Sequence, residues 1–378
     1  MKVMSVVGAR PQFVKAAPVS KILRATHTEL LVHTGQHYDD TMSDAFFRDL
    51  EMPAPDVNLE VGSGTHGAQT ANMLLRLEPV LLEHEPDGVL LYGDTNSTLA
   101  AAVVACKVAY RDGRPPWIAH VEAGLRSHNL AMPEERNRIV ADHLSDLLLA
   151  PTRAAMEHLD REGLSQRAEL AGDVMVDAFR WATARALAQP PQVARRQPGY
   201  VLATLHRAEN VDDPARLAAW LAALAVDRPV ILPLHPRTRS TLAAAGLQLP
   251  DNVDLVEPVG YLEMVALELH ATAIATDSGG VQKEAYLAGV PCITLRTETE
   301  WVETVAAGWN RLVGDDPSGL RAALADSTFM DRSRPRPDLY GDGNAAQRIV
   351  AALERLDQRR PARATTERTP QPTEASAS

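Results

Sequence analysis

Three acidic side chains in the first half of the chain stand where they could move protons. Asp94 and Glu122 each come directly after a short apolar run typical of a buried strand, and Glu134 opens a predicted helix. Because parallel strands end at one edge of a sheet, these carboxyl groups are expected to lie close together. Crowded carboxylates push each other's pKa values apart, which allows one to act as acid and another as base. The simpler structural interpretations are a helix cap for Asp94 and an ion pair between Glu134 and Arg138.

Two basic side chains follow the first predicted strand, within the stretch Gly8-Ala9-Arg10-Pro11-Gln12-Phe13-Val14-Lys15. Pro11 suits the first position of a helix, because the N–H that proline lacks would have no intrahelical acceptor there. Arg10 and Lys15 add positive charge beside a helix N-terminus, which itself favours anions. The stretch therefore predicts an anion site, with a solvated basic turn as the alternative.

A second candidate for anion binding lies in the other half, at Thr276-Asp277-Ser278-Gly279-Gly280. An apolar run leads into this stretch and a helix-forming run leads out of it. Gly279 and Gly280 let a ligand approach the backbone, and the first helical N–H groups after Ser278 can bind a phosphate. Glu284, one turn further on, could accept a hydrogen bond from a sugar hydroxyl. An ordinary strand-to-helix turn is the alternative, because short Gly-rich turns are common.

Histidines also follow predicted strands. His206 comes after the first strand of the second half and is a candidate acid, base or phosphate donor. His235 and Arg237 occupy the matching place after the next strand, where a nucleotide contact and a plain turn are both open. The stretch 35–38, which includes His37, is equally ambiguous.

Short apolar runs alternate with longer amphipathic ones through the first half of the chain, and the alternation begins again in the second. Continuous apolar strands separated by helices predict parallel sheets covered on both faces, with ligands bound beyond the carboxyl ends of the strands. The predicted strands are 3–7, 30–33, 88–92, 117–121 and 147–150, then 199–205, 230–234, 253–256, 271–276 and 292–295. The clearest predicted helices are 12–24, 68–83, 98–110, 133–145 and 344–358.

The predicted fold class is α/β, with two Rossmann-like doubly wound domains facing a cleft. A Pro-rich break between 172 and 199 separates the two halves. We expect an N-terminal domain with the carboxylates over 1–172 and a C-terminal domain over 173–358, whose last helix could pack back on the first domain. The remaining segment, 359–378, is rich in Arg, Pro, Thr, Ser and Glu and is predicted to be a disordered tail.

The composition excludes several classes of function. With 378 residues and a net charge of -11, the chain is long enough for two domains and poorly suited to nucleic acid or anionic membranes. No run approaches the roughly 18 apolar residues of a membrane helix, so the expected location is the cytoplasm. Without a metal-ligand spacing, a Gly-x-Gly-x-x-Gly turn or a Walker loop, no metal and no nicotinamide cofactor are predicted. Cys106 and Cys292 are expected to be buried, reduced thiols.

Five motifs in a fixed order make the chain resemble the non-hydrolysing UDP-N-acetylglucosamine 2-epimerase family, from Met1 to about residue 355. Five ordered motifs are far more specific than any one alone. They are Gly8-Ala9-Arg10-Pro11-Gln12, Gly93-Asp94-Thr95-Asn96, His120-Val121-Glu122-Ala123-Gly124-Leu125-Arg126, Pro133-Glu134-Glu135 with Asn137-Arg138, and Asp277-Ser278-Gly279-Gly280 with Gln282 and Glu284.

The resemblance implies the two-Rossmann-domain (GT-B) architecture of nucleotide-sugar glycosyltransferases, usually as a homodimer, with UDP bound by the second domain. It implies a reaction that interconverts UDP-GlcNAc and UDP-ManNAc. The implied groups around C2 of the sugar are Asp94, Glu122 and Glu134. The implied groups near the diphosphate, the sugar and the ribose are Arg10, Lys15, Arg138, His206, Ser278, Gly279, Gly280 and Glu284.

The chain departs from the best-known members of that family in two places. Glu298-Thr299-Glu300-Trp301-Val302-Glu303 stands where they carry Arg-Pro after Thr-Glu, and is similar to the pattern of relatives acting on UDP-2,3-diacetamido-glucuronate. The segment 38–42 does not resemble the one that lines a second, activating substrate site in bacterial members, so allosteric activation is not carried over. A glycosyltransferase of the same architecture, a hydrolysing relative that releases ManNAc, and a nucleotide-sugar binding module are the other hypotheses.

Overall fold

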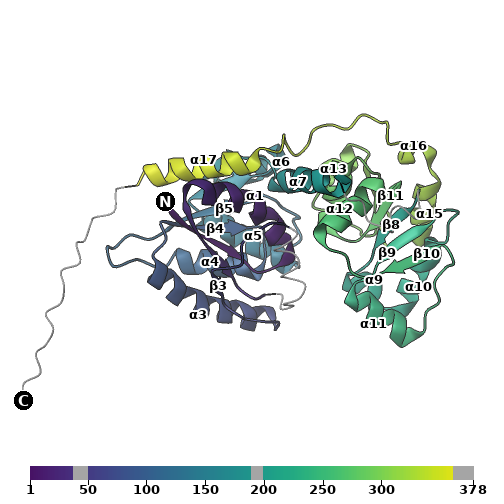
Figure 1. Cartoon of the computed structure of the whole chain (residues 1–378), viewed down its shortest axis with the longest axis horizontal. Coiled ribbons are helices and arrows are strands. Elements are labelled where there is room, and N and C mark those ends of the chain that lie inside the picture. The colour runs from purple at the N-terminus through teal and green to yellow at the C-terminus, as the bar shows by residue number, and fades with distance from the viewer. Residues whose placement is uncertain (37–49, 189–198, 361–378) are drawn as a thin grey trace, which may run out of the picture.

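The computed structural model describes residues 1–36, 50–188 and 199–360, which form two parallel sheets with helices on their faces (Figure 1). One sheet has the strand order β3-β2-β1-β4-β5-β6-β7 and the other β10-β9-β8-β11-β12-β13. In both sheets the order reverses beside the first strand, between β1 and β4 and between β8 and β11. Open α/β sheets bind ligands at such a reversal, so the topology points to these two places. The predicted fold class, two Rossmann-like units, is confirmed.

The strands lie close to the predicted runs because buried parallel strands are continuously apolar. The paired residues Val6 and Val32, Val6 and Leu91, and Tyr92 and Val121 show that neighbouring strands end at the same level. The strands anticipated from the sequence are β1 (Lys2–Val7), β2 (Thr28–His33), β4 (Gly88–Tyr92), β5 (Trp117–Val121), β6 (Leu147–Ala150), β8 (Val201–Thr204), β9 (Val230–Pro233), β10 (Val253–Val256), β11 (Ala273–Thr276) and β12 (Cys292–Thr294).

Three further strands were not predicted, and all three lie at sheet edges. They are β3 (Val57–Asn58), β7 (Ala168–Leu170) and β13 (Asn310–Leu312). An edge strand pairs on one side only and tolerates polar residues, so two or three residues of mixed polarity carry no recognisable period.

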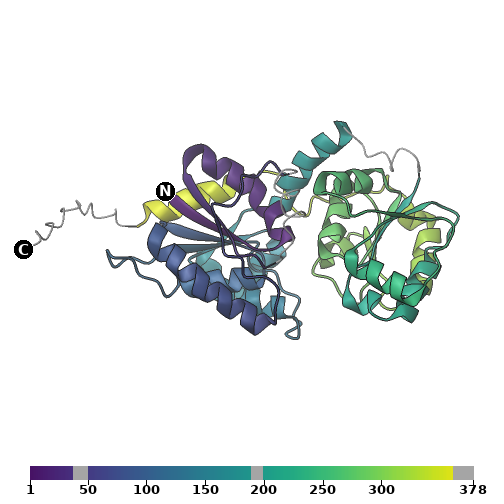
Figure 2. The same cartoon turned by 60° about the horizontal axis from the view of Figure 1, so that its bottom comes forward.

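Helices cover both faces of each sheet (Figure 2). In the first unit they are α1 (Arg10–Thr26), α3 (His66–His84), α4 (Asn96–Ala105), α5 (Pro133–Leu144) and α6 (Arg153–Arg161), with a 3-10 turn at Ser165–Arg167, and α7 (Val174–Ala188) follows in contact with both units. In the second they are α9 (Ala208–Val211), α10 (Pro214–Ala223), α11 (Pro236–Ala245), α12 (Tyr261–His270), α13 (Gly279–Ala288), α14 (Val302–Ala306), α15 (Pro317–Ala325) and α16 (Ser327–Met330). The last helix is α17 (Ala345–Gln358).

The helix predicted over 98–110 is five residues too long at its C-terminus. Helix α4 ends at Ala105, and the chain then makes a turn in which Tyr110 N–H donates to the Arg114 carbonyl. The Asp112-Gly113 pair, with Gly113 at φ +79°, favours that turn over further helix. Cys106 therefore caps the helix and is exposed, so the prediction that both thiols are buried is wrong for Cys106 and correct for Cys292.

Two segments connect the sheets. Helix α7 packs against α1 of the first unit and α12 of the second, and its apolar side chains join one core with both. After α16 the chain returns to the first unit, where α17 packs on α1 and α7 (Figure 1). Along α17 the buried residues Ile349, Val350 and Leu353 recur at helical spacing, which explains the docking of this face.

The boundary at residue 172 and the assignment of α7 to the second domain stay predictions. The tail from 361 to 378 and the ambiguous His37 lie outside the described residues. Among the residues that the structure describes, no helix is both long and apolar enough to span a bilayer.

Candidate active site between the two sheets

Lys15 is held at the end of the first sheet by the way α1 begins. The Gln12 amide accepts from the N–H groups of Gly8 and Ala9, at 2.8 and 3.1 Å, and donates to the Tyr92 carbonyl at 2.7 Å. These bonds tie the start of α1 to the ends of β1 and β4. Lys15, one turn into the helix, then reaches Glu122 and forms an ion pair with its Oε2.

Glu122 occupies a strained position directly after β5. Its φ of +70° lies in the left-handed region, which costs a residue with a Cβ roughly 1 kcal/mol or more. The side chain is buried, and burial alone would raise its pKa. The ammonium groups of Lys15 and Lys283 and the guanidinium of Arg138 outweigh that effect and lower the pKa of Glu122 to about 2. Glu122 is therefore an anion at neutral pH.

A second charged cluster lies beside it at the ends of β4 and α5. Arg138 forms ion pairs with both Asp94 and Glu135, and these two carboxylates raise its pKa against the opposing effect of burial. Glu135 also accepts from the backbone N–H groups of Ser127 and His128. The cap of α4 is Thr95 rather than Asp94, so the simpler interpretation of Asp94 does not apply. The partners of Arg138 are likewise Asp94 and Glu135, whereas an ion pair with Glu134 was the simpler expectation.

A buried carboxylate organises the loop after β8 in the second unit. Asp277 accepts from the N–H groups of His206 and Arg207, each at 3.0 Å, and from the Asn210 amide at 3.1 Å. The His206 Nδ1 atom lies 3.2 Å from Asp277 Oδ1. Burial lowers the pKa of His206, partly offset by Asp277, so its imidazole is neutral at pH 7. If Nδ1 carries the proton towards Asp277, Nε2 is left as an acceptor.

The N-terminus of α13 lies across from these groups, at the strand-order reversal of the second sheet. Ser278 caps the helix, its hydroxyl accepting from Val281 N–H at 3.5 Å. The N–H groups of Gly279 and Gly280 fall in the first turn, where a helix offers no internal acceptor. The Gly279 carbonyl accepts from Trp301 Nε1 at 2.8 Å, which fixes the turn. This terminus has the geometry of an anion site.

Glu284, one turn into α13, is a second buried carboxyl group. Burial raises its pKa to about 7, although Glu268, Tyr261 and Lys283 act in the opposite direction. Glu268 lies behind it, fully buried, and its pKa is raised well above the usual range by burial and by Glu284. Glu284 can therefore change its charge near neutral pH.

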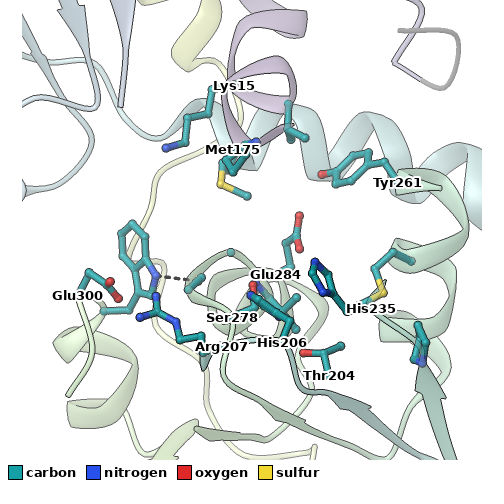
Figure 3. Close-up of a pocket in the computed structure, with 18 of the residues that line it drawn as sticks. Lys15, Met175, Thr204, His206, Arg207, His235, Tyr261, Ser278, Glu284 and Glu300 are labelled. Carbon is teal, nitrogen blue, oxygen red and sulfur yellow. Dashed lines mark hydrogen bonds between the residues drawn. The ribbon is translucent and has the colours of Figure 1, made fainter. Parts of the chain in front are cut away.

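One cavity of about 600 Å³ joins the edges of the two sheets, a size typical of a small-molecule site. In Figure 3, Lys15 and Met175 face His206, Ser278 and Glu284 across it. The cavity brings together the predicted residues Lys15, Asp94, Glu122, Glu134, Arg138, His206, Ser278, Gly279, Gly280 and Glu284. His235 lines it as well, and its ring centroid lies 5.5 Å from that of His206.

Two predicted residues are not placed there. The side chain of Arg10, at the first position of α1, is outside what the structure describes. Arg237 forms an exposed ion pair with Asp212 and is not among the described residues that line the cavity. Sequence reasoning missed Arg207, Tyr261 and Met175 as lining residues, and it missed Lys283, which contacts Glu122 from behind.

In the described part of the chain, no three His, Cys, Asp or Glu side chains gather into a group that could hold a metal ion. The polar groups around the cavity include carboxylates, ammonium and guanidinium ions, two imidazoles and the donors of one helix terminus. Such a set suits proton transfer beside an anionic ligand.

Comparison with known proteins supports this description. The family model described as UDP-N-acetylglucosamine 2-epimerase matches residues 21–354. The chain belongs to the UDP-N-acetylglucosamine 2-epimerase family. A relative from Pseudomonas aeruginosa named UDP-2,3-diacetamido-2,3-dideoxy-D-glucuronate 2-epimerase is 46% identical, over 94% of this chain and 100% of its own length. A UDP-N-acetylglucosamine 2-epimerase from Methanocaldococcus jannaschii is 41% identical, over 93% of this chain and 99% of its own.

Solved structures of this epimerase family have the same architecture. The UDP-GlcNAc 2-epimerase of Methanocaldococcus jannaschii, in complex with UDP-GlcNAc and UDP, superimposes with a TM-score of 0.84 at 40% identity, covering 94% of this chain and 100% of that one. The enzyme from Neisseria meningitidis bound to UDP-GlcNAc gives a TM-score of 0.83 at 30% identity, over 94% and 100%. The resemblance stated from the five sequence motifs is confirmed.

Proposed function

We propose that the protein is a non-hydrolysing C2 epimerase that interconverts UDP-GlcNAc and UDP-ManNAc. The observation that carries the proposal is the placement of Asp94, Glu122 and Glu134 on one side of a cavity whose other side is the N-terminus of α13. This arrangement suits a ligand with an anionic diphosphate at one end and a carbon acid at the other. The ligand-bound relatives support UDP-GlcNAc as that ligand.

The reaction follows from the charges. Departure of UDP from C1 builds positive character on the sugar ring, which acidifies the neighbouring C2–H bond. A carboxylate takes the C2 proton, the C–H electron pair becomes the C1–C2 double bond, and the C1–O pair leaves with UDP. Return of a proton to the opposite face of C2, and of UDP to C1, gives the epimer. Proton exchange on two faces explains the need for more than one carboxyl group.

The second unit stabilises the departing diphosphate in this proposal. Ser278, Gly279 and Gly280 donate to it, with Lys15 and Arg10 adding charge from the first unit and His206 reaching its side. Glu284 accepts from the ribose hydroxyls, and Arg138 holds Asp94 towards the sugar. A closed cavity retains the glycal and UDP so that re-addition competes with escape.

Epimerisation in deuterated water tests the proposal. Incubation with UDP-GlcNAc and no acceptor should give UDP-ManNAc carrying deuterium at C2, with traces of UDP and 2-acetamidoglucal. Retention of the original C2 hydrogen would contradict the mechanism. No reaction without an added acceptor would indicate a glycosyltransferase, and stoichiometric free ManNAc would indicate hydrolysis.

A second candidate substrate is UDP-2,3-diacetamido-glucuronate. The 46% identity to the Pseudomonas aeruginosa relative favours it, together with the segment 298–303, in which Glu300 and Trp301 line the cavity. A panel of UDP-sugars followed by proton NMR separates the two, since the higher kcat/KM identifies the better substrate.

The same proposal includes a homodimer. Leu75 and Leu82, seven residues apart on α3, are 70% and 48% exposed and could meet a second copy. Light scattering of the purified protein should give twice the 41.0 kDa chain mass, and a monomer mass would contradict this part.

A further inference from the structure

Lys283 is a buried cation that does not belong to the cavity wall. It lies on α13 between Gln282 and Glu284, and its side chain is fully buried. It is absent from the described residues that line the cavity. Burying an ammonium group is costly unless the group is paired, so the partners of Lys283 explain why it can be there.

Those partners come from three separate parts of the chain. The Nζ atom lies 2.5 Å from Asp173 Oδ2 and 3.4 Å from Glu122 Oε1, and 4.0 Å from the centre of the Trp301 ring. Glu122 follows β5 of the first sheet, and Asp173 directly precedes α7. Lys283 itself belongs to the second sheet's α13. Through this one ammonium group, α13 of the second unit contacts both Glu122 of the first unit and Asp173 at the start of α7.

Asp173 is fixed in place independently of Lys283. Its Oδ1 accepts from Met175 N–H at 2.9 Å, and its own N–H donates to the Tyr340 carbonyl at 3.2 Å. Only Oδ2 is directed to Lys283, so Asp173 anchors the ammonium group rather than moving with it.

The two oxygens of Glu122 have different neighbours. Oε2 is paired with Lys15, which lines the cavity, and Oε1 is approached by Lys283 from behind. A diphosphate in the cavity would compete with Glu122 for Lys15, because the diphosphate carries two negative charges and the carboxylate one. Lys283 cannot be drawn away in that manner, since it has no access to the cavity.

We propose that Lys283 is a positioning residue for the epimerisation. It holds Oε1 of Glu122 so that Oε2 faces C2 of the sugar, and it keeps this carboxylate charged when Lys15 turns to the diphosphate. The C2 proton is then transferred to Oε2 as the C1–O bond breaks. The inference rests on the proposed function and adds a link from the second unit to the base of the first.

The charges around Glu122 determine what loss of Lys283 would do. The facing cations are Lys15 from α1, Arg138 from α5 and Lys283 from α13. The facing anions are Asp94 and Asp173, which act on Lys15, and Glu303, which lies near Lys283. With Lys283 removed, one of three cations is lost while burial is unchanged, so the pKa of Glu122 must rise.

The test is Lys283→Met, which keeps an unbranched side chain one atom shorter and removes its charge. We expect kcat at pH 7 to fall about tenfold or more while KM stays within about twofold, because Lys283 does not touch the ligand. The acid limb of kcat should move up by about one pH unit or more, since an adjacent opposite charge lowers a carboxyl pKa by about that amount. Lys107→Met, at an exposed lysine of the first unit, is the matched control and should leave both unchanged.

Two further variants separate positioning from folding. Lys283→Met with Asp173→Asn removes both buried charges together and avoids an unpaired Asp173, and it should shift the acid limb in the same direction by a smaller amount, because the nearby Asp173 anion is lost as well. Lys283→Arg keeps the charge and should keep the limb where wild type has it, even if kcat falls. Thermal stabilisation by UDP confirms that each variant is folded.

An acid limb that stays in the wild-type position in folded Lys283→Met and in the double variant would overturn the inference, leaving Lys283 a structural residue. Wild type is assayed alongside. If wild type gives no epimer, the proposed function fails instead, so the two failures are distinguishable.

Discussion

The two units share a strand order but present opposite kinds of chemistry at their reversal points. The first offers charged side chains joined in ion pairs: Lys15 with Glu122, and Arg138 with Asp94. The second offers backbone N–H groups at a helix terminus and the neutral imidazole of His206. Backbone N–H donors fixed at a helix terminus suit the binding of an anionic ligand, whereas ionised side chains suit the movement of a proton. The topology fixes where a site can form, and the side chains decide what it can do.

Neutralising a carboxylate of the first unit should have the largest effect. In Glu122→Gln and Asp94→Asn, kcat should fall about a thousandfold, within the range of general acid–base catalysis. The Kd for UDP should change by no more than a few fold, because most of the proposed contacts to UDP come from the second unit. Steady-state rates and calorimetry with UDP measure the two quantities. Turnover near the wild-type rate, or a loss of UDP affinity as large as the loss of kcat, would contradict the different roles of the two units.

Each unit also has one fully buried aspartate that holds a loop, and these two can be compared directly. Asp142 accepts from His120 Nδ1 at 2.7 Å and pairs with Arg126 at 2.8 Å. Asp277 mainly accepts from neutral backbone N–H groups. Asp142→Ala should cost about 3–5 kcal/mol of unfolding free energy, because it breaks a fully buried ion pair, leaves Arg126 with Glu162 as its remaining carboxylate partner and removes the acceptor of His120 Nδ1. Asp277→Ala should cost about 1–3 kcal/mol.

Urea unfolding of both variants measures the difference. Equal losses would show that the charge of the partners does not distinguish the two loops. Asp277→Ala should also weaken UDP binding, because the backbone N–H groups of His206 and Arg207 lose their acceptor. Asp142→Ala should instead lower kcat more than it weakens UDP binding.

Ser278→Ala tests whether the second unit acts in UDP binding rather than in turnover. The loss of its cap should destabilise α13 by about 1 kcal/mol. Loss of a hydroxyl contact to a charged phosphate should weaken UDP binding by about tenfold. The value of kcat should stay within a few fold, and calorimetry beside steady-state rates checks this. A variant that binds UDP normally but turns over slowly would reverse the proposed division of roles.

The smallest effect concerns Glu284 of the second unit, whose pKa burial raises to about 7. The pKa of Glu284 rises from an ordinary value of 4.5 to about 7 on folding, so between these values the folded state binds more protons than the unfolded one. The stabilisation is complete below pH 4.5 and is lost as the pH rises through 7. The Tm of the ligand-free protein should fall by roughly 2 °C or more from pH 5 to pH 8.

Glu284→Gln should flatten that dependence, and differential scanning calorimetry across the pH range is the measurement. A wild-type Tm that rises over the same range would show that other groups dominate.

Much of the fold followed from the sequence because buried parallel strands are continuous apolar runs with helices between them. The runs ending at Tyr92 and Val121 also predict that Asp94 and Glu122 lie at one sheet edge. The predictions that failed concern short segments with little hydrophobic periodicity. Edge strands such as Asn310–Leu312 are too short and polar to show a period, and the end of α4 depended on the turn at Asp112.

Contacts between the two units could not be predicted from the sequence, for a different reason. Lys283 reads in sequence as one charged residue in a helix, and nothing near it indicates that Asp173 and Glu122 would surround it. Tyr261 and Met175 line the cavity because α12 and α7 are packed together, which local pattern does not encode. The strained φ of Glu122 likewise depends on the finished sheet.

The return of the chain to α17 has a mechanical consequence. The polypeptide passes between the two units twice, at α7 and again before α17, so two covalent connections join them. Two connections restrict relative rotation more than one does, so we expect the units to rotate mainly about the line through both. We therefore expect the opening between the sheets to widen and narrow mainly along one direction, and cleavage near Tyr340 should remove one of the two connections.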